Sequence, residues 1–324
     1  SECLVGSEMC IRDRGIQSNG ISACPKHFAV NSQELRRMAS DSVVDERTLR
    51  ELYLTGFEIV VKEAHPKTIM SSYNLVNGTY ANENAHLLQN ILRRDWGFDG
   101  AVVTDWGGSN DHALGVKNGS TLEMPAPGGD AVRELLKAVE TGKISESDVD
   151  ARLDELLTLV FDTHAAVQSH SRTFDADAHH ALARRAAAES IVLLKNENNT
   201  LPLKAARRIA VIGPMAQNRL HLLGAWSAHG REEDAVSLFA GLENEYRGRA
   251  ELLYARGCDF DGEDRSGFRE AVAAAAAADV VVLCLGEKKQ WSGENASRST
   301  IALPEIQEQL AAELAQTGKP LVLV

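Results

Sequence analysis

Short apolar runs and amphipathic stretches alternate along the first half of this 324-residue chain, between Ile21 and Gly142. Each apolar run has the length of a buried strand, and the stretches between them place apolar residues at helical spacing. Strands that alternate with helices of about 10–15 residues form βαβ units around a parallel sheet. We therefore expect an α/β fold with four parallel strands in this region, at Ile21–Phe28, Thr68–Tyr73, Gly100–Asp105 and Thr121–Met124.

The amphipathic stretches predict four helices, at Asp45–Lys62, Glu83–Arg94, Ala131–Glu140 and Ser145–Phe161. A closed β/α barrel needs eight strand–helix units, so four units make half of one. The chain then becomes polar and rich in histidine over 162–180, which predicts a linker. A second α/β region follows, with strands expected at 191–194, 208–212, 251–254, 280–285 and 320–324 and helices at 181–189, 268–277 and 304–317.

The composition excludes several classes of protein. The formal net charge is −12 and no basic stripe offsets it, which argues against a nucleic-acid partner. No apolar run approaches the roughly 18 residues of a membrane-spanning helix, so we expect no membrane partner. No cluster has metal-ligand spacing, and Ile212-Gly213-Pro214 is not a phosphate-binding loop, so we expect no metal and no cofactor. The expected partner is a small neutral molecule.

The cysteines carry little functional information. Their odd number and wide separation predict free thiols, buried as small apolar residues, rather than a disulfide framework. Free thiols favour the cytoplasm slightly over secretion, but the localisation stays open. The five cysteines are Cys3, Cys10, Cys24, Cys258 and Cys284.

The first fourteen residues look foreign to the rest of the chain. Glu8–Arg14 can be encoded by GAGATGTGTATAAGAGACAG, which resembles a transposon end used in sequencing libraries. We therefore expect 1–14 to be a non-native, adapter-derived segment and the fold to begin near Gly15. The second region stops inside an expected strand, so we expect a fragment truncated at both ends, and the sequence says nothing about a signal peptide.

Asp105 is the residue with the strongest functional signal. It follows the apolar run Gly100–Thr104 and precedes Trp106. An acid followed by a tryptophan is a poor end for a purely structural strand. The same pair places a carboxylate at the carboxyl end of a strand, where β/α-barrel enzymes carry their catalytic groups. The alternative is that Asp105 caps the helix after the strand.

Three motifs resemble glycoside hydrolase family 3, the β-glucosidase family. They are KHFAVNSQE from Lys26, YNLVNG from Tyr73 and the run from Trp96 to Trp106, and they occur in family order and at close to family spacing. The stretch 187–203 is similar to the entry into that family's second domain. The resemblance implies that 15–161 is the C-terminal half of a (β/α)8 TIM-type barrel. It also implies that 181–324 is a truncated α/β sandwich domain.

The resemblance also implies the roles of single residues. Asp105 matches the catalytic nucleophile. The other positions also have alternatives. The arginine could be Arg36 instead of Arg37, the strand-end residues could simply be solvated, and the aromatic residues could pack in the core. These are the residues that match sugar-binding positions: Lys26, His27, Arg37, Tyr73 and Trp106. Glu123, at the end of the next strand, resembles a family motif and either lines the pocket or is structural.

A second catalytic group is expected from a loop of the second domain. Glu294, in Ser-Gly-Glu, best matches the acid/base position, and Glu287 is its rival. A working acid needs a raised pKa, which nearby cations oppose. The fold must therefore keep three cations of this stretch away from Glu294, namely Lys288, Lys289 and Arg298.

Taken together, the motifs imply a retaining exo-acting β-glycosidase of the β-glucosidase type. Its expected substrates are small oligosaccharides or aryl and alkyl β-glycosides, hydrolysed through a covalent glycosyl–Asp105 intermediate. A β-xylosidase of the same family is one alternative. The other is that this chain is a non-catalytic fragment, because half a barrel leaves strand edges unpaired. The oligomeric state is not predicted.

Overall fold

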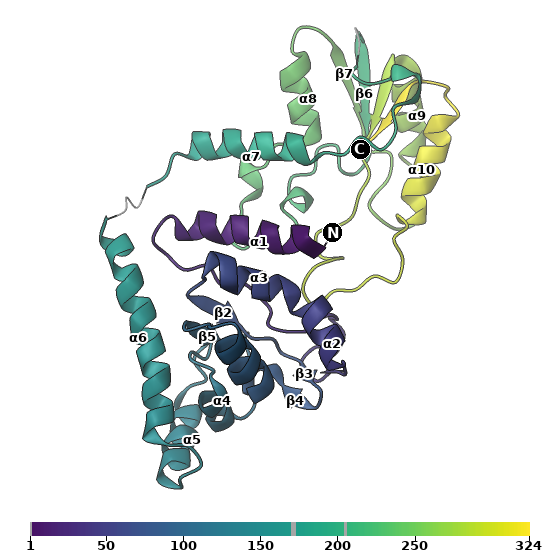
Figure 1. Cartoon of the computed structure of the whole chain (residues 1–324). Coiled ribbons are helices and arrows are strands. Elements are labelled where there is room, and N and C mark those ends of the chain that lie inside the picture. Colours follow the sequence, from purple (N-terminus) through teal and green to yellow (C-terminus); the bar gives the residue numbers. More distant parts are fainter. Residues whose placement is uncertain (1, 170–172, 204–205) are drawn as a thin grey trace. The chain divides into compact units, whose positions relative to one another are not determined.

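The computed structural model describes residues 2–169, 173–203 and 206–324, and the chain divides into two compact units (Figure 1). The first unit is Ser1–Asp175 and the second is Ala176–Val324. Both units are α/β, as expected from the alternation of strands and helices. Among the described residues, no helix is both long and apolar enough to cross a membrane.

The first unit is built on four parallel segments. Strand β2 (Thr68–Met70) pairs with β5 (Ala101–Val103), with Thr68 opposite Ala101 and Met70 opposite Val103. Parallel bridges add Phe28 on one side, opposite Ser71, and Leu122 on the other side, opposite Val103. The segments that end near Phe28, Ser71, Val103 and Leu122 therefore lie side by side in chain order, and their carboxyl ends share one edge.

Helices cover this layer through a continuous apolar core. The core joins Phe28, Ile69 and Val102 of the parallel segments to buried leucine and isoleucine side chains of the flanking helices. The helices of this unit are α1 (Glu2–Gln17), α2 (Glu46–Thr48), α3 (Thr55–Ala64), α4 (His112–Asn118), α5 (Gly129–Glu140) and α6 (Glu146–Ser169). Shorter or irregular elements are β1 (Asp41–Ser42), η1 (Leu49–Tyr53), β3 (Leu75–Val76), β4 (Thr79–Tyr80), η2 (Ala81–Glu83) and η3 (His86–Asp95).

The structure divides one expected helix and contains another helix that was not expected. The helix predicted over Asp45–Lys62 is divided into α2, the π-helical turn η1 and α3. The hydroxyl of Thr55 donates to the carbonyls of Arg50 and Glu51, which is the kind of side-chain competition that interrupts a helical ladder. Helix α4 was not predicted, although Asp111 caps its start and Gly119, in the left-handed conformation, ends it.

Helix α1 overlaps the segment 1–14 that we expect to be adapter-derived. It packs against α3, where Cys10 contacts Val60 and Ala64 in a small apolar cluster. Figure 1 shows the two helices side by side. The non-native origin of 1–14 stays a prediction, because packing does not report where a segment comes from.

The described part of the predicted linker 162–180 is mostly helical, and its role as a linker stays a prediction. Helix α6 continues past Phe161 to Ser169, and α7 (Ala176–Ser190) begins before the end of the predicted linker. The division between the units falls at Asp175, within the same stretch. The polar composition reflects solvent exposure on a helix, and no glycine or proline interrupts 162–169.

The second unit contains a four-stranded parallel sheet in the order β7-β6-β8-β9. Alternate residues of β6 face opposite cores: Ala210 and Ile212 belong to one apolar cluster, Ile209 and Val211 to the other. The sheet is therefore covered on both faces, as parallel sheets usually are. The elements are β6 (Arg208–Ile212), α8 (Leu238–Tyr246), β7 (Glu251–Ala255), α9 (Phe268–Ala277), β8 (Val280–Leu283), α10 (Glu305–Ala315) and β9 (Leu321–Leu323), with short turns η4 (Glu197–Asn199), η5 (His221–Leu223) and η6 (Glu232–Asp234).

One predicted strand of the second unit is wrong. The apolar stretch Ile191–Leu194 is not a strand in the structure, and Leu194 is 92% exposed. An apolar run becomes a strand only where a neighbouring strand accepts its hydrogen bonds. No strand among the described residues pairs with 191–194.

The cysteines with described side chains are free thiols, as expected, and three of them are buried. Burial raises the pKa of Cys258 to about 11 and that of Cys284 to about 12. These thiols are therefore protonated and unreactive at neutral pH. The side chain of Cys3 lies outside the described residues.

Candidate active site

Asp105 lies at the carboxyl edge of the parallel layer, directly after β5. Its side chain is only 7% exposed. Oδ1 accepts a hydrogen bond of 2.8 Å from the backbone N–H of Trp106. Oδ2 lies 3.1 Å from Nε2 of His27. The carboxylate is thus held in a fixed orientation by a backbone group and by a side chain from a neighbouring segment.

The surroundings of Asp105 favour its ionised form. Burial pushes the pKa of this carboxyl upward, but hydrogen bonds from His27, from the N–H of Trp106 and from Tyr73 outweigh burial, and the pKa lies below its ordinary value. Asp105 is therefore a carboxylate at neutral pH. An oriented, ionised carboxylate at a strand end is chemically suited to attack an electrophilic carbon.

The parallel layer explains why these residues meet. The N–H of Phe28 donates to the carbonyl of Met70, which places His27 at the same edge as the residues that follow β2. Tyr73 follows β2 by three residues and is buried. The carboxyl ends of adjacent parallel strands share one edge, so His27, Tyr73 and Asp105 come together although they are far apart in sequence. Lys26 also lies at this edge and is exposed.

Arg37 is the arginine that faces this cluster. Its guanidinium carbon lies 4.7 Å from the centre of the Tyr73 ring, and Nη1 lies 3.2 Å from Oε2 of Glu34. Arg36 is exposed and adopts a positive φ of 55°. The geometry therefore favours Arg37 over the adjacent register. Glu34, which holds the guanidinium, was not singled out from the sequence as a site residue.

Trp106 presents an open aromatic face. It is 49% exposed, so the alternative that it packs in the core does not hold. The loop after it turns back at once, because the N–H of Gly108 donates to the carbonyl of Asp105 over 2.9 Å. A flat, half-exposed indole beside a carboxylate is the arrangement that stacks against the apolar face of a sugar ring.

Glu83 supports this loop and was missed as a site residue. Its Oε1 accepts hydrogen bonds from the backbone N–H groups of Asn110 (2.6 Å) and Asp111 (3.0 Å). Glu83 is buried, and burial raises the pKa of its carboxyl despite these two bonds. From the sequence it was indistinguishable from a solvated first-turn acid of the following helix. Only the burial reveals its structural role.

Glu123 has a structural partner rather than an open position. His112 of α4 places Nδ1 2.8 Å from Oε2 of Glu123. The hydroxyl of Ser109 lies 3.1 Å from the same ring nitrogen. Glu123 therefore ties the end of the fourth parallel segment to α4. Of the two roles weighed from the sequence, the structural one has the contacts.

The second unit carries Glu294 on the loop between β8 and α10. Glu294 lines a cavity of about 410 Å³ with Trp226, Lys289 and Gln290. The preceding Gly293 has φ of 103°, and a Cβ on it would lie 2.4 Å from that of Ala225. Glycine is therefore required at 293 both by the backbone conformation and by the close approach of the neighbouring segment.

Two of the three cations near Glu294 are bound to other carboxylates. Arg298 forms an ion pair with Glu287, and Lys288 lies 2.8 Å from Oδ1 of Asp261. The charge of each of these two cations is therefore compensated by a carboxylate other than Glu294. Lys289 is the cation that shares the cavity with Glu294.

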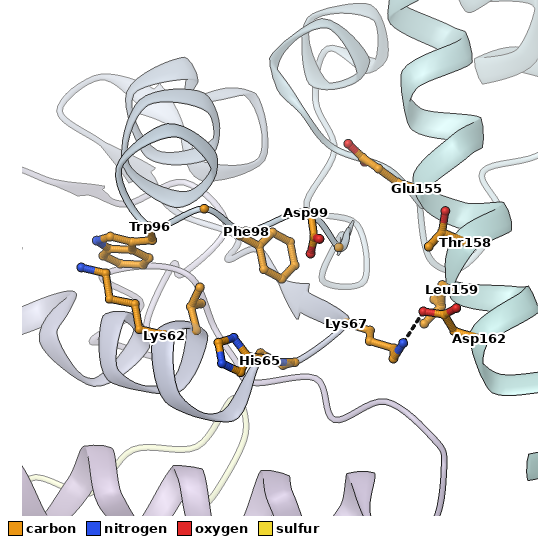
Figure 2. Close-up of a pocket in the computed structure, with 14 residues that line it drawn as sticks. Lys62, His65, Lys67, Trp96, Phe98, Asp99, Glu155, Thr158, Leu159 and Asp162 are labelled. Carbon is orange, nitrogen blue, oxygen red and sulfur yellow. Dashed lines mark hydrogen bonds and ion pairs between the residues drawn. The ribbon is translucent and has the colours of Figure 1, made fainter.

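A further pocket of the first unit lies away from Asp105. Its volume is about 540 Å³, and Lys67 and Gly100, which directly precede β2 and β5, line it. It therefore opens at the amino ends of the strands, opposite Asp105. Figure 2 shows Lys67 bonded to Asp162 at its rim, with Trp96 and His65 across from them. None of the predicted site residues lines this pocket.

Metal chemistry has no candidate ligand set in the described part of the chain. No group of three or more histidine, cysteine, aspartate or glutamate side chains there could hold an ion. The polar groups around Asp105 are instead hydrogen-bond donors, which suit hydroxyl groups and carboxylates.

The chain is similar to known proteins over most of its length. Two family models match the chain, the glycosyl hydrolase family 3 N-terminal domain over residues 7–159 and the C-terminal domain of the same family over 191–324. The chain is 39% identical over 313 residues to thermostable beta-glucosidase B of Acetivibrio thermocellus, covering 96% of the chain and 41% of that protein. It is 36% identical over 331 residues to an exo-alpha-(1->6)-L-arabinopyranosidase of Bifidobacterium longum, covering 99% and 43%.

The chain is also similar to solved structures of beta-glucosidases. A family 3 beta-glucosidase of Bifidobacterium adolescentis superimposes with a TM-score of 0.86 at 36% identity, over 95% of this chain and 45% of that one. A beta-glucosidase of Listeria innocua in complex with glucose has a TM-score of 0.86 at 30% identity, over 96% and 46%. The chain thus spans less than half the length of these relatives.

Proposed function

Because the chain belongs to glycoside hydrolase family 3, we propose that the protein containing it is a retaining exo-acting β-glycosidase of the β-glucosidase type. The observation that carries the proposal is the buried, ionised carboxylate of Asp105, oriented by His27 and by the N–H of Trp106. The relatives named beta-glucosidase support the choice of sugar. Small oligosaccharides and aryl or alkyl β-glucosides are the proposed substrates.

The proposed reaction has two steps. In the first, an oxygen of Asp105 forms a bond to the anomeric carbon while the bond to the glycosidic oxygen breaks, and Glu294 donates a proton to that oxygen. In the second, Glu294 takes a proton from water, whose oxygen attacks the same carbon and releases Asp105. Two inversions leave the anomeric configuration retained. The low pKa of Asp105 matches the first step, which needs a carboxylate.

The neighbours of Asp105 have proposed roles in binding the sugar. Lys26, His27 and Arg37 offer N–H donors to ring hydroxyls. Tyr73 supports both Asp105, by a hydrogen bond, and Arg37, by stacking. Trp106 offers its exposed face to the sugar ring. A contact that strengthens as positive charge develops on the sugar stabilises the transition state more than the bound substrate, and therefore raises kcat.

The domain organisation proposed for the whole protein follows from the first unit. Four parallel segments in chain order, with helices between them, support the assignment of 15–161 to the C-terminal half of a (β/α)8 barrel. The sheet of the second unit supports an α/β sandwich domain over 181–324. The relatives, which are about twice as long as this chain, are consistent with the complementary half lying outside it.

A second candidate substrate is an α-L-arabinopyranoside. Two relatives with 36% identity bear the name exo-alpha-(1->6)-L-arabinopyranosidase. This sugar also presents an equatorial glycosidic bond to an attacking carboxylate, so the same two-step chemistry applies. The names of the relatives do not favour the β-xylosidase alternative.

A substrate panel with product analysis tests the proposal. The full-length protein that carries this chain is assayed with p-nitrophenyl β-D-glucoside, β-D-xyloside and α-L-arabinopyranoside, and the first sugar released is examined by proton NMR. We expect the highest kcat/KM for the glucoside and a β-anomer as the initial product. Initial release of the α-anomer would contradict a retaining mechanism, and preference for the arabinopyranoside would establish the second candidate.

A further inference from the structure

The loop that carries Glu294 has a rigid base. It leaves β8 and returns to α10, and Gln307 of that helix is completely buried beneath it. The N–H of Gly286 donates to the Gln307 side chain over 3.0 Å, and the Gln307 amide donates to the carbonyls of Gly286 (2.8 Å) and Phe260 (2.7 Å). Gly286, near the start of the loop, is therefore held by two hydrogen bonds to Gln307, which is itself anchored to Phe260.

The span of the loop is closed by an ion pair. Glu287 and Arg298, eleven residues apart, form a salt bridge across its base, and their side chains are 34% and 23% exposed. Arg298 also donates to the carbonyl of Ala302 over 2.9 Å. A pair that is this well covered and has a further hydrogen bond restrains a loop more effectively than a solvated pair does.

Trp291 belongs to the same span and contacts two of its cations. Its ring centre lies 5.4 Å from the guanidinium carbon of Arg298 and 5.3 Å from Nζ of Lys288. Lys288 is itself held by Asp261 over 2.8 Å. Both cations thus contact the indole and a carboxylate at once. Glu294 is three residues beyond Trp291 and lies between the two ends joined by the ion pair.

We propose that Glu287, Arg298 and Trp291, here called the clasp, are positioning residues that hold Glu294 where it can protonate the leaving oxygen. The inference rests on the proposed function of Glu294. It also assigns Glu287, the rival acid, to a structural task, because its carboxylate is engaged by Arg298. A displacement of about 1 Å in a catalytic group can cost roughly 100-fold in rate, so the clasp has a kinetic consequence.

The dependence of the rate on the leaving group isolates this role. The glycosidic oxygen of a methyl glycoside or an oligosaccharide leaves as an alcohol and needs the proton from Glu294, whereas 2,4-dinitrophenolate leaves without a proton. Because kcat/KM reports the first bond-breaking step, opening the clasp lowers kcat/KM for methyl β-glucoside much more than for the dinitrophenyl glucoside. A general loss of folded protein lowers both to the same extent.

The test compares Arg298→Gln, Glu287→Gln and the double variant in the full-length protein. The control is Arg208→Met, which removes a 2.9 Å pair with Glu251 at the amino ends of β6 and β7, whereas the loop follows the carboxyl end of β8. We expect each single clasp variant to lower kcat/KM for methyl β-glucoside by about 10- to 100-fold and for the dinitrophenyl glucoside by less than about threefold. The double variant is expected to match the single ones, because the two residues act as a unit.

Hydrogen–deuterium exchange supplies a readout that needs no activity. Peptides covering 287–298 should exchange faster in both single variants than in wild type. Their exchange should be unchanged in Arg208→Met. Equal losses of kcat/KM for the two substrates, or unchanged exchange over 287–298, would contradict the positioning role of the clasp. Failure of the proposed function looks different: wild-type protein would hydrolyse neither glucoside, and exchange alone would then decide whether the clasp restrains the loop.

Discussion

At the scale of single residues, the balance of forces on Asp105 decides what the site can do. Burial alone would make this carboxyl a weak nucleophile by raising its pKa. Three donors from three different segments reverse that effect, and two of them are separated from Asp105 by more than 30 residues in sequence. The motif containing Asp105 predicts its role, but the direction of its pKa follows only from the neighbours that the parallel layer brings to it.

Replacing His27 with alanine tests this balance. The variant loses the partner 3.1 Å from Oδ2, so the pKa of Asp105 should rise. The nucleophile must be ionised, and the acidic limb of the kcat/KM profile therefore shifts to higher pH. A hydrogen bond to a charged group contributes about 1.5–3 kcal/mol, which corresponds to roughly 10- to 100-fold in kcat/KM.

The matched control for His27→Ala is His86→Ala. His86 also lies within hydrogen-bond distance of a carboxylate, 2.8 Å from Glu46, but on the exposed surface of η3. Its removal should leave the pH profile unchanged. An acidic limb that stays in place in His27→Ala would show that His27 does not set the ionisation of Asp105.

Glu83 should contribute to stability in a pH-dependent way. Burial raises its pKa in the folded state above the unfolded value, so the charged form is less favourable in the folded protein. Its contribution is fully present below the unfolded pKa and is lost as the pH rises through the folded pKa. Glu83→Gln keeps an oxygen for the N–H groups of Asn110 and Asp111 without the charge. The Tm of this variant relative to wild type should increase as the pH rises above the ordinary pKa of a glutamate, about 4.3.

Glu83→Ala is the control, and we expect it to lower the Tm. It leaves two backbone N–H groups without their acceptor, at a cost of about 1–3 kcal/mol each. Its Tm should therefore lie below that of wild type across the same range. If Glu83→Gln and wild type show the same dependence of Tm on pH, Glu83 does not titrate in the manner inferred from its burial.

At the scale of elements, hydrophobic periodicity predicted most strands. It failed where strand pairing decides the structure and where a helix is short. The apolar runs at 68–73, 208–212 and 280–285 are strands because neighbours pair with them. The equally apolar run 191–194 lacks such a partner and is irregular. Helix α4 was hidden because it is short, although Asp111 and Gly119 mark both of its ends. Local propensity states what a segment can form, and pairing decides what it does form.

Two glycines of the second unit provide a prediction about element packing. A Cβ on Gly213, at the end of β6, would lie 2.1 Å from the carbonyl oxygen of Cys284, and its φ is 122°. Gly213→Ala must therefore move the backbone, at a cost of several kcal/mol. Gly241, inside α8, has no atom within 4 Å of a Cβ. Gly241→Ala should stabilise by about 0.5–1 kcal/mol.

Urea denaturation measures both effects. The transition of the second unit should move to lower urea in Gly213→Ala and to higher urea in Gly241→Ala. A Gly213→Ala variant as stable as wild type would be inconsistent with the close approach of Gly213 to Cys284.

At the scale of the whole molecule, the proposed chemistry is divided between two units. Asp105 with its donors belongs to the first unit and Glu294 with its loop belongs to the second. Sequence motifs identified the residues proposed to bind the substrate, because the identity of such residues is dictated by chemistry. Glu34, Glu83 and the pairing of Glu287 with Arg298 could not be predicted, because a supporting residue can be of several types and is recognised only by what it contacts.

Azide rescue tests the division of roles between the units. In the full-length protein, Glu294→Gln should hydrolyse aryl glucosides slowly, because no base activates water in the second step. Azide needs no deprotonation, so it should restore turnover and yield β-glucosyl azide. Glu287→Gln is the comparison and should show no rescue. Rescue of Glu287→Gln instead of Glu294→Gln would reverse the assignment of the two glutamates.

The most direct test of the central claim is to trap the covalent intermediate. A 2-deoxy-2-fluoro-β-glucoside with a dinitrophenyl leaving group slows the second step more than the first, so the glycosyl–enzyme accumulates. The full-length protein is treated with this reagent, digested and sequenced by mass spectrometry. We predict one added fluoroglucosyl group, attached to Asp105 and absent from Asp105→Asn. A label on another carboxylate, or hydrolysis of the reagent with no covalent adduct, would contradict the account.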